Sequence, residues 1–293
     1  MLSEAARPYI DASVPVLREH GLAITTHFYN SLFAAHPELK NIFNMSNQAN
    51  GTQQQSLAAA VFAYAANYRT PDALTPVVER IVHKHASLGI KAEHYPIVGQ
   101  HLLEAIKAIL GDAATPELLA AWDEAYGVLA NILIDAEKKL YAQAGINAGD
   151  LQTLVVKEVR KESDNVTSFY LQTVDGKSPG VFHPGHYISV AITNNGLRQL
   201  RQYSLSDAPE QPWWRISVKR EDEVQPGGLI SNWLHANVKV GDTLQTSAAF
   251  GDFKPGIDGS APIVLLSAGV GITPMVSVLN TLAERNPNRR VLF

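Results

Sequence analysis

The feature that most constrains this chain is a histidine, His85, on the apolar face of a predicted helix. The apolar residues of that face recur at spacings of three and four, the period of a helix with one buried side: Leu74, Val77, Val78, Ile81 and Leu88. His83 lies two residues away and therefore projects to another side of the helix. Neutral imidazole is a common ligand of iron, so His85 indicates a metal or a metal cofactor. A lone histidine on an apolar face is more often an ordinary core residue, so this interpretation needs support from elsewhere in the chain.

Four polar side chains supply that support, because they also lie among apolar helical positions. Tyr29 lies on a predicted helix rich in aliphatic and aromatic residues, and Gln53 opens another predicted helix. Tyr95 and Glu137 are set among otherwise apolar helical surfaces. Each is weak support alone, because a buried tyrosine usually needs only a hydrogen-bond partner. Together they favour the ligand interpretation of His85.

Residues 1–143 resemble a globin, and more narrowly the bacterial flavohaemoglobins. The run AHPELKNIFNM at 35–45 is similar to the family's short helix and corner. The run HKHASLGIKAEHYPIVG at 83–99 is similar to the family's segment on the proximal side of the haem. The resemblance covers the whole first half of the chain and implies an all-α globin fold that binds haem b through its iron.

The resemblance also implies a role for each residue on the proximal side. His85 is then the axial iron ligand, with Tyr95 and Glu137 as its hydrogen-bonding partners. A carboxylate bound to the proximal imidazole makes that imidazole a stronger electron donor, which favours activation of dioxygen over storage. Phe43 is expected to pack on the haem, and Lys84 to pair with a haem propionate.

On the distal side the resemblance implies two hydrogen-bond donors for dioxygen, Tyr29 and Gln53. Tyr29 is the stronger candidate of the two. The rest of the pocket is expected to be apolar and so to admit small apolar gases. The residues expected to line it are Phe28, Phe43, Leu57 and Val61.

Composition limits the remaining possibilities. With 293 residues, two or more domains are expected. The net charge of −4 gives no sign of a nucleic-acid partner. The absence of cysteine excludes disulfides, thiolate ligation of haem and cysteine-held iron–sulfur clusters. No signal peptide and no apolar run of membrane-spanning length is present, so we expect a soluble cytoplasmic protein.

The texture of the sequence changes near residue 145. A long helical pattern over 116–141 gives way to a glycine-containing stretch at 144–150 that is typical of a linker. Short alternating segments follow, at 151–159, 167–173 and 215–219, and they predict a small antiparallel β-barrel or sandwich.

Three motifs in this β region resemble the flavin site of the ferredoxin–NADP reductase superfamily. The first is Pro-Gly-His-Tyr at 184–187, in which His186 replaces the usual glutamine. The second is Arg-Gln-Tyr-Ser at 201–204, and the third is Gly-Leu-Ile-Ser at 228–231. The motifs are short, but their order inside a β-rich stretch supports the resemblance. The residues implied to bind FAD are Tyr187, Arg201, Gln202, Tyr203, Ser204, Gly228 and Ser231.

Each of these residue types suits a part of FAD. An arginine can pair with the pyrophosphate, a tyrosine can stack on the isoalloxazine, and a serine can bond the polar edge of the flavin. A glycine turn that opens a helix presents free backbone N–H groups to the diphosphate.

His183, His186 and His235 are not spaced as a metal site. Trp213 and Trp214 are interpreted as packing residues.

A third segment begins at residue 260. A buried strand over 263–266, a glycine-rich turn and a helix from about 274 to 285 are predicted, with a second strand at 290–293. In the reductase superfamily the turn is similar to the one that binds the NAD(P)H pyrophosphate: Gly269, Val270, Gly271, Ile272, Thr273 and Pro274. One βαβ unit cannot cover both faces of a parallel sheet, so we expect this lobe to be incomplete and NAD(P)H turnover to be weak or lost.

These observations give one expected organisation. A globin domain occupies 1–143, a linker 144–150, an antiparallel FAD-binding β-barrel 151–259, and the start of an α/β NAD(P)-binding lobe 260–293. The resemblance implies a nitric oxide dioxygenase that oxidises nitric oxide to nitrate with dioxygen and with electrons from NAD(P)H through FAD.

Two other functions stay open. One is an oxygen or lipid carrier or a gas sensor that uses the globin pocket. The other is a flavin reductase for ferric iron or quinones, with the globin regulatory. The expected partners are dioxygen and nitric oxide, with a lipid in the distal pocket as a further candidate. We expect a monomer that is not an integral membrane protein.

Overall fold

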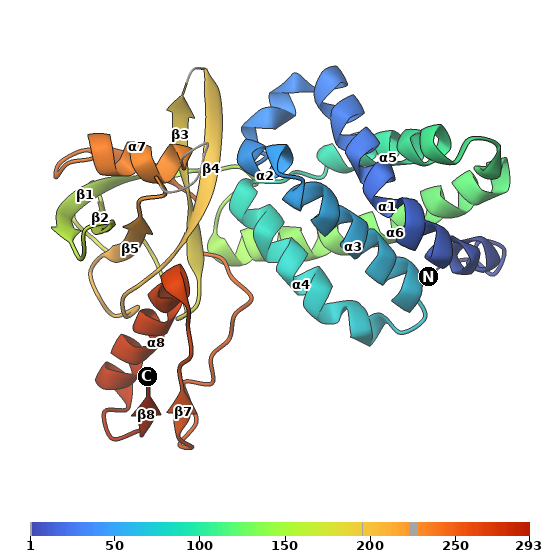
Figure 1. The fold of residues 1–293 in the computed structure, drawn as a ribbon. Helices are drawn as coiled ribbons and strands as arrows, with labels where there is room; N and C mark the ends of the chain where they lie inside the picture. The colour runs from blue at the N-terminus through green and yellow to red at the C-terminus, as the bar shows by residue number, and fades with distance from the viewer. Residues whose placement is uncertain (1, 195, 223–227) are drawn as a thin grey trace. The chain divides into compact units, whose positions relative to one another are not determined.

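The computed structural model describes residues 2–194, 196–222 and 228–293. The chain divides into two compact units, Met1–Ala86 with Ile90–Ala148, and Ser87–Gly89 with Gly149–Phe293. The first unit is helical, and the second is built on a β-sheet (Figure 1). Within the described ranges no helix is both long and apolar enough to cross a membrane.

The first unit contains six α-helices and two short 3-10 helices among its described residues. Their bounds are α1 Arg7–Ala35, η1 Pro37–Asn41, α2 Met45–Ala49, α3 Thr52–Asn67, α4 Pro71–Leu88, α5 His94–Leu110, η2 Gly111–Ala113 and α6 Pro116–Ala144. The expected all-α globin fold is confirmed for this unit.

Local sequence sets the ends of the longest predicted helix, α6. The Thr115 side chain accepts a hydrogen bond from the Leu118 N–H at 3.2 Å, which caps the N-terminus, and Pro116 occupies the first turn. Gly145 ends the helix in the left-handed conformation, with a φ of 67°. The helix expected over 116–141 is therefore three residues longer than predicted.

The core of the first unit lies between α1, α3, α5 and α6. Phe28, Leu32 and Ala105 are buried, and α1 packs against both α3 and α5. The indole N–H of Trp122 on α6 donates to the Ser13 hydroxyl on α1 at 3.0 Å. This bond satisfies both buried polar groups, so α1 and α6 can pack closely without an unpaired donor.

The second unit is an antiparallel sheet that closes on itself. Its six strands lie in the order β4-β3-β6-β1-β2-β5 and all pair antiparallel. An isolated bridge between Leu205, directly after β4, and Ile216 of β5 connects the two edges of the sheet. The expected β-barrel is confirmed, with the bounds β1 Gln152–Lys161, β2 Val166–Thr173, β3 Tyr187–Asn194, β4 Leu197–Ser204, β5 Trp214–Lys219, α7 Leu229–Asn237 and β6 Thr243–Thr246.

Alternating side chains fill the barrel. Trp214, Ile216 and Val218 on β5 are buried while the residues between them are half-buried, as a strand with one core face requires. Phe169 and Leu171 on β2 belong to the same core. Of the tryptophan pair interpreted as packing residues, Trp214 is a core residue.

The third segment forms a parallel pair of short strands with one helix beside it (Figure 1). Its elements are β7 Ile263–Val264, η3 Gly269–Gly271, α8 Ile272–Arg285 and β8 Val291–Leu292. The helix begins two residues earlier than expected, and the second strand is shorter than the range 290–293.

The prediction of a fully buried strand over 263–266 is wrong. The side chains of Val264 and Leu266 are 65% and 88% exposed, whereas Leu265 is buried against Val278 and Leu282 of α8. The physical reason is that, among the described residues, α8 covers one face of the strand pair, so side chains that alternate along the chain meet either α8 or solvent.

A close approach between α5 and α6 gives a stability prediction. A Cβ added to Gly99 would lie 2.6 Å from Cε1 of Tyr126, whereas one added to Gly127 of α6 would meet nothing within 4 Å. We expect Gly99→Ala to lower the free energy of unfolding by about 1–3 kcal/mol through overpacking. Gly127→Ala, the matched control, should leave it unchanged or raise it, because alanine favours helix. Urea unfolding measures both, and equal effects would contradict the packing argument.

Candidate functional site

Three helices of the first unit bring His85, Tyr95 and Glu137 together. His85 lies near the end of α4, Tyr95 in the first turn of α5 and Glu137 in the last third of α6. The Tyr95 hydroxyl donates to Oε1 of Glu137 at 2.6 Å, and Nδ1 of His85 lies 2.8 Å from the same oxygen. Nδ1 of His85 is also 3.1 Å from the Tyr95 hydroxyl oxygen. The sequence predicted these three residues to be neighbours, and the structure places them so.

This arrangement determines which nitrogen of His85 is available to a ligand. A carboxylate oxygen accepts hydrogen bonds, so the His85 tautomer that suits this contact has its proton on Nδ1 and donates to Glu137. In the neutral ring Nε2 then keeps its lone pair. The Glu137 side chain is only 3% exposed, whereas the His85 side chain is 31% exposed, so the carboxylate is sealed in the protein and the imidazole is not.

Burial, reinforced by the bond to Glu137, raises the pKa of Tyr95 far above its ordinary value. The phenol therefore remains a proton donor at neutral pH. The carboxylate thus keeps two donors, one from Tyr95 and one from His85, which is the condition for burying a charge.

Two further tyrosines of α6 hold the backbone that carries Tyr95. The Tyr126 hydroxyl donates to the Tyr95 carbonyl oxygen at 2.7 Å, and the Tyr141 hydroxyl donates to the Ile90 carbonyl oxygen at 2.8 Å. Residues 126, 137 and 141 are separated by three turns and then one turn of helix, so they share one side of α6. Sequence reasoning missed these two positioning residues, although that spacing was a signal for them.

The predicted distal residues Tyr29, Phe43 and Gln53 also come together. Tyr29 of α1 is buried, and its ring lies edge-on to Phe43 with the centroids 5.7 Å apart. A hydrogen bond links its side chain to Gln53 in the first turn of α3. Burial raises the pKa of Tyr29 well above its ordinary value, and the bond to Gln53 offsets only part of this, so the phenol stays protonated.

A close helix contact fixes α1 against α3 near these two side chains. The Thr25 hydroxyl oxygen is 3.0 Å from the Gln54 carbonyl oxygen on α3 and 3.0 Å from the Gly21 carbonyl oxygen on its own helix. A Cβ on Gly21 would make ordinary contact with Ala58 at 3.6 Å. Tyr29 lies one turn after Thr25, and Gln53 precedes Gln54, so this contact sets the spacing between the two predicted donors.

The single imidazole of His85 suits a metal cofactor in which most of the metal ligands belong to the cofactor. No three histidine, cysteine, aspartate or glutamate side chains gather as a metal-binding group in the part of the chain that the structure describes. One imidazole with a free Nε2 fits haem iron, whose other ligands come from the macrocycle. Lys84, expected to meet a propionate, is exposed.

In the second unit, β3 and β4 bring two of the flavin motifs side by side. Their register places Tyr187 opposite Ser204 and Ser189 opposite Gln202. The Gln202 amide donates to the Ser189 hydroxyl at 2.9 Å. Because side chains alternate along a strand, Arg201 and Tyr203 share one face of β4.

Arg201 and Tyr203 on this face, and Tyr187 on the other face with Ser204, are each half-buried. Burial lowers the pKa of Arg201, although the guanidinium remains charged at neutral pH, and its Nη1 donates to the Leu200 carbonyl oxygen at 2.8 Å. Burial raises the pKa of Tyr203 well above its ordinary value and that of Tyr187 to about 12. A partly desolvated cation on the same face as the neutral Tyr203 phenol is suited to an anionic, partly aromatic ligand.

Glycines in two of the motifs are required by close contacts. Gly185 has a φ of +101°, and a Cβ there would lie 2.6 Å from the Phe253 carbonyl oxygen. A Cβ on Gly228, at the point where α7 begins, would lie 2.8 Å from Cβ of Glu221. The packing of Phe253 against the Pro-Gly turn was not visible in the sequence.

The predicted pyrophosphate turn, residues 269–274, forms η3 and the first turn of α8. Gly269 has a φ of +53°, which glycine adopts without strain. A buried aspartate, Asp207, ties α8 to the barrel: its Oδ1 accepts from the Asn280 amide at 2.8 Å, and its carbonyl oxygen accepts from the Ser277 hydroxyl at 2.7 Å. Sequence reasoning did not find this anchor.

Two family models match the chain, one in each of its two compact units. The globin family model matches residues 26–133, and the model described as oxidoreductase FAD-binding domain matches residues 153–254. The fold and site therefore define a haem-type globin joined to a flavin-reductase-type barrel.

Relatives that align along the whole of this chain show which family it belongs to. The flavohemoprotein of Rhizobium meliloti is 50% identical over 299 residues, an alignment that covers all of this chain and 74% of the relative. The flavohemoprotein of Halalkalibacterium halodurans is 47% identical, with all of this chain and 73% of the relative covered. A crystal structure of a flavohemoglobin from Malassezia yamatoensis with bound FAD and heme matches 99% of this chain and 76% of its own, with a TM-score of 0.86 and 31% identity. This chain belongs to the flavohemoprotein family.

Proposed function

We propose that this chain is a haem- and FAD-containing oxidoreductase that converts nitric oxide to nitrate with dioxygen and NAD(P)H. The observation that carries the proposal is the buried Glu137 carboxylate bound to both His85 and Tyr95. We place the haem domain at 1–143, a linker at 144–150, the flavin domain at 151–259 and the NAD(P)H-binding segment at 260–293.

On the proximal side, His85 would hold the haem through Nε2. When bound, haem supplies an iron that binds and activates dioxygen. Glu137 increases the electron donation of the imidazole through Nδ1–H, which favours oxidative chemistry over reversible carriage. Tyr95 fixes the carboxylate, and Tyr126 fixes Tyr95 through its carbonyl oxygen.

On the distal side, Tyr29 would donate a hydrogen bond to dioxygen. Its phenol is buried and protonated, and Gln53 orients it. Phe43 and Phe33 pack against the ring and exclude water from it, which strengthens that bond.

In the second unit, FAD would lie against the face of β4 and the start of α7. FAD accepts hydride from NAD(P)H and can pass on single electrons. Arg201 is suited to the pyrophosphate, Tyr203 and Tyr187 to the flavin, and the backbone at Gly228 to the diphosphate charge. We place the NAD(P)H pyrophosphate at residues 269–274.

A single-turnover assay tests the activity directly. The protein is reduced with dithionite, freed of reductant, equilibrated with air and mixed with nitric oxide, and nitrate is counted. We expect about one nitrate per haem, and nitric oxide loss without nitrate would contradict the proposal.

In Tyr29→Phe the buried hydrogen bond, worth about 1–3 kcal/mol, is lost, so dioxygen release should become about 10-fold to 100-fold faster. Tyr68→Phe, which removes a hydroxyl that donates to Asp11 in an exposed pair, should change neither the nitrate yield nor the rate of dioxygen release.

Glu137→Gln tests the proximal assignment. Loss of the negative charge makes His85 a weaker donor, so the haem midpoint potential should rise by about 59 mV, which is a tenfold change for a one-electron couple. Spectroelectrochemical titration measures this. Glu117→Gln, an exposed change in the first turn of the same helix, is the control. An unchanged potential in Glu137→Gln would remove the carboxylate from the proximal role.

Arg201→Ala tests the flavin site. Loss of the buried guanidinium should weaken FAD binding by about 10-fold or more, because a charge-assisted bond to phosphate is lost, and should leave the haem absorption band intact. Flavin fluorescence titration measures the affinity. Arg198→Ala is the control, since residue 198 lies on the opposite face of β4. Equal losses in both variants would argue for general damage to the barrel.

A further inference from the structure

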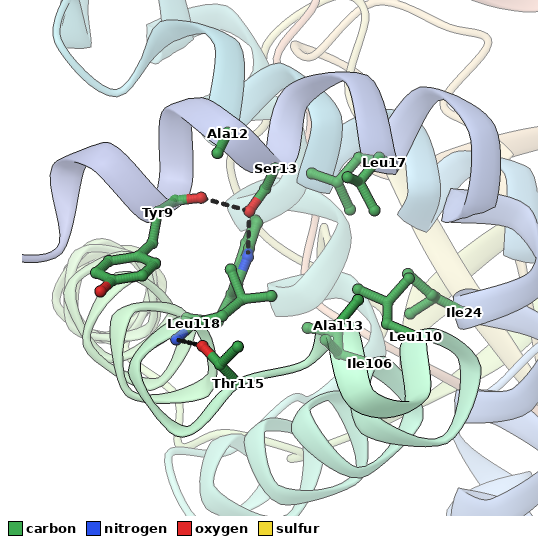
Figure 2. Close-up of a pocket in the computed structure, with 12 residues that line it drawn as sticks. Tyr9, Ala12, Ser13, Leu17, Ile24, Ile106, Leu110, Ala113, Thr115 and Leu118 are labelled. Carbon is green, nitrogen blue, oxygen red and sulfur yellow. Dashed lines mark hydrogen bonds between the residues drawn. The ribbon is translucent and has the colours of Figure 1, made fainter.

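A cavity of about 240 Å³ lies in the helical unit, away from every residue assigned above to haem or dioxygen. Side chains of α1, the end of α5 and the start of α6 converge on it (Figure 2). Its walls are mostly aliphatic, and the residues that carry the argument are Ser13, Leu17, Ile24, Ile106, Leu110 and Leu118.

The hydroxyls of Ser13 and Thr115 in these walls already have partners. The Ser13 hydroxyl donates to the Tyr9 carbonyl oxygen at 2.7 Å and accepts from the Trp122 indole N–H at 3.0 Å (Figure 2). The Thr115 hydroxyl oxygen accepts from the Leu118 N–H at 3.2 Å. A water molecule inside a cavity needs two to four polar partners, and these walls offer few. The cavity therefore suits an uncharged, apolar occupant.

The cavity has a buried floor and an accessible rim. Leu17, Ile24 and Ile106 are buried, whereas Ala12 and Ala113 are exposed. A small molecule can therefore reach the apolar floor from solvent without unfolding the core.

We propose that this cavity is a binding site for small uncharged apolar molecules, from xenon to benzene in size. An enclosed, engineered cavity of about 150 Å³ lined by apolar side chains binds benzene or xenon, so the volume of this partly open cavity is sufficient. Dioxygen and nitric oxide belong to the same chemical class. The proposal rests on the volume and polarity of the walls, so it does not depend on the activity proposed above.

Crystals of the full chain pressurised with xenon test the site. We expect an anomalous peak between Leu17, Ile106 and Leu110. Ala12→Phe and Val16→Phe each enlarge a residue that lines the cavity, and the peak should be lost in both. Ala23→Phe is the matched control, because Ala23 is an exposed residue of the same helix that does not line the cavity. The peak should persist there.

Three results would overturn the proposal. One is no peak in this cavity while xenon occupies another part of the same crystal. Another is a peak that persists in both filling variants. The third comes from solution titration: binding of decanoate without binding of xenon or benzene would assign the cavity to an acyl chain instead.

Discussion

The helical unit depends on one buried negative charge. Glu137 is almost fully enclosed and its Oε1 is shared between the Tyr95 hydroxyl and the His85 imidazole. A carboxylate in such surroundings is costly unless donors surround it, and leaving a buried acceptor without its donor costs about 1–3 kcal/mol, and more when the acceptor is charged. The three helices that supply the donors and the acceptor are therefore held in one arrangement, and the same bond sets the tautomer of His85. A single interaction serves stability and chemistry together.

The second unit uses the same device. Asp207 is buried, its Oδ1 accepts from Asn280, and its Oδ2 accepts from the Trp213 indole N–H at 3.2 Å. The Arg215 guanidinium lies 3.6 Å from Oδ2. Because both oxygens are engaged, α8 is tied to the barrel through side chains as well as apolar packing. The start of α8, where the pyrophosphate turn lies, is thereby fixed relative to β5.

The sequence predicted the parts of this architecture that repeat with a regular period. His85 could be found because it interrupts an apolar stripe, and the strands of the barrel because their side chains alternate. The spacing of Tyr126 and Tyr141 placed them on the side of α6 that carries Glu137, but it could not give their partners, because their hydroxyls bind carbonyl oxygens of residues 31 and 51 positions away. Asp207 escaped notice for the same reason, since its partner Asn280 is 73 positions distant. Val264 and Leu266 misled the analysis because a short apolar run is equally consistent with burial on one face or on two.

Two kinds of interior in the helical unit follow from one rule, that buried polar groups must be paired. Around His85 the groups are paired with one another so that one imidazole nitrogen remains for a ligand. Around Ser13 the hydroxyl bonds close within the protein wall, and most of the remaining surface is hydrocarbon. The first interior can recognise a metal or a polar ligand by direction. The second can select only by size and polarity. The difference between a site for chemistry and a site for an apolar molecule therefore lies in which atoms are left over after the protein has satisfied its own hydrogen bonds.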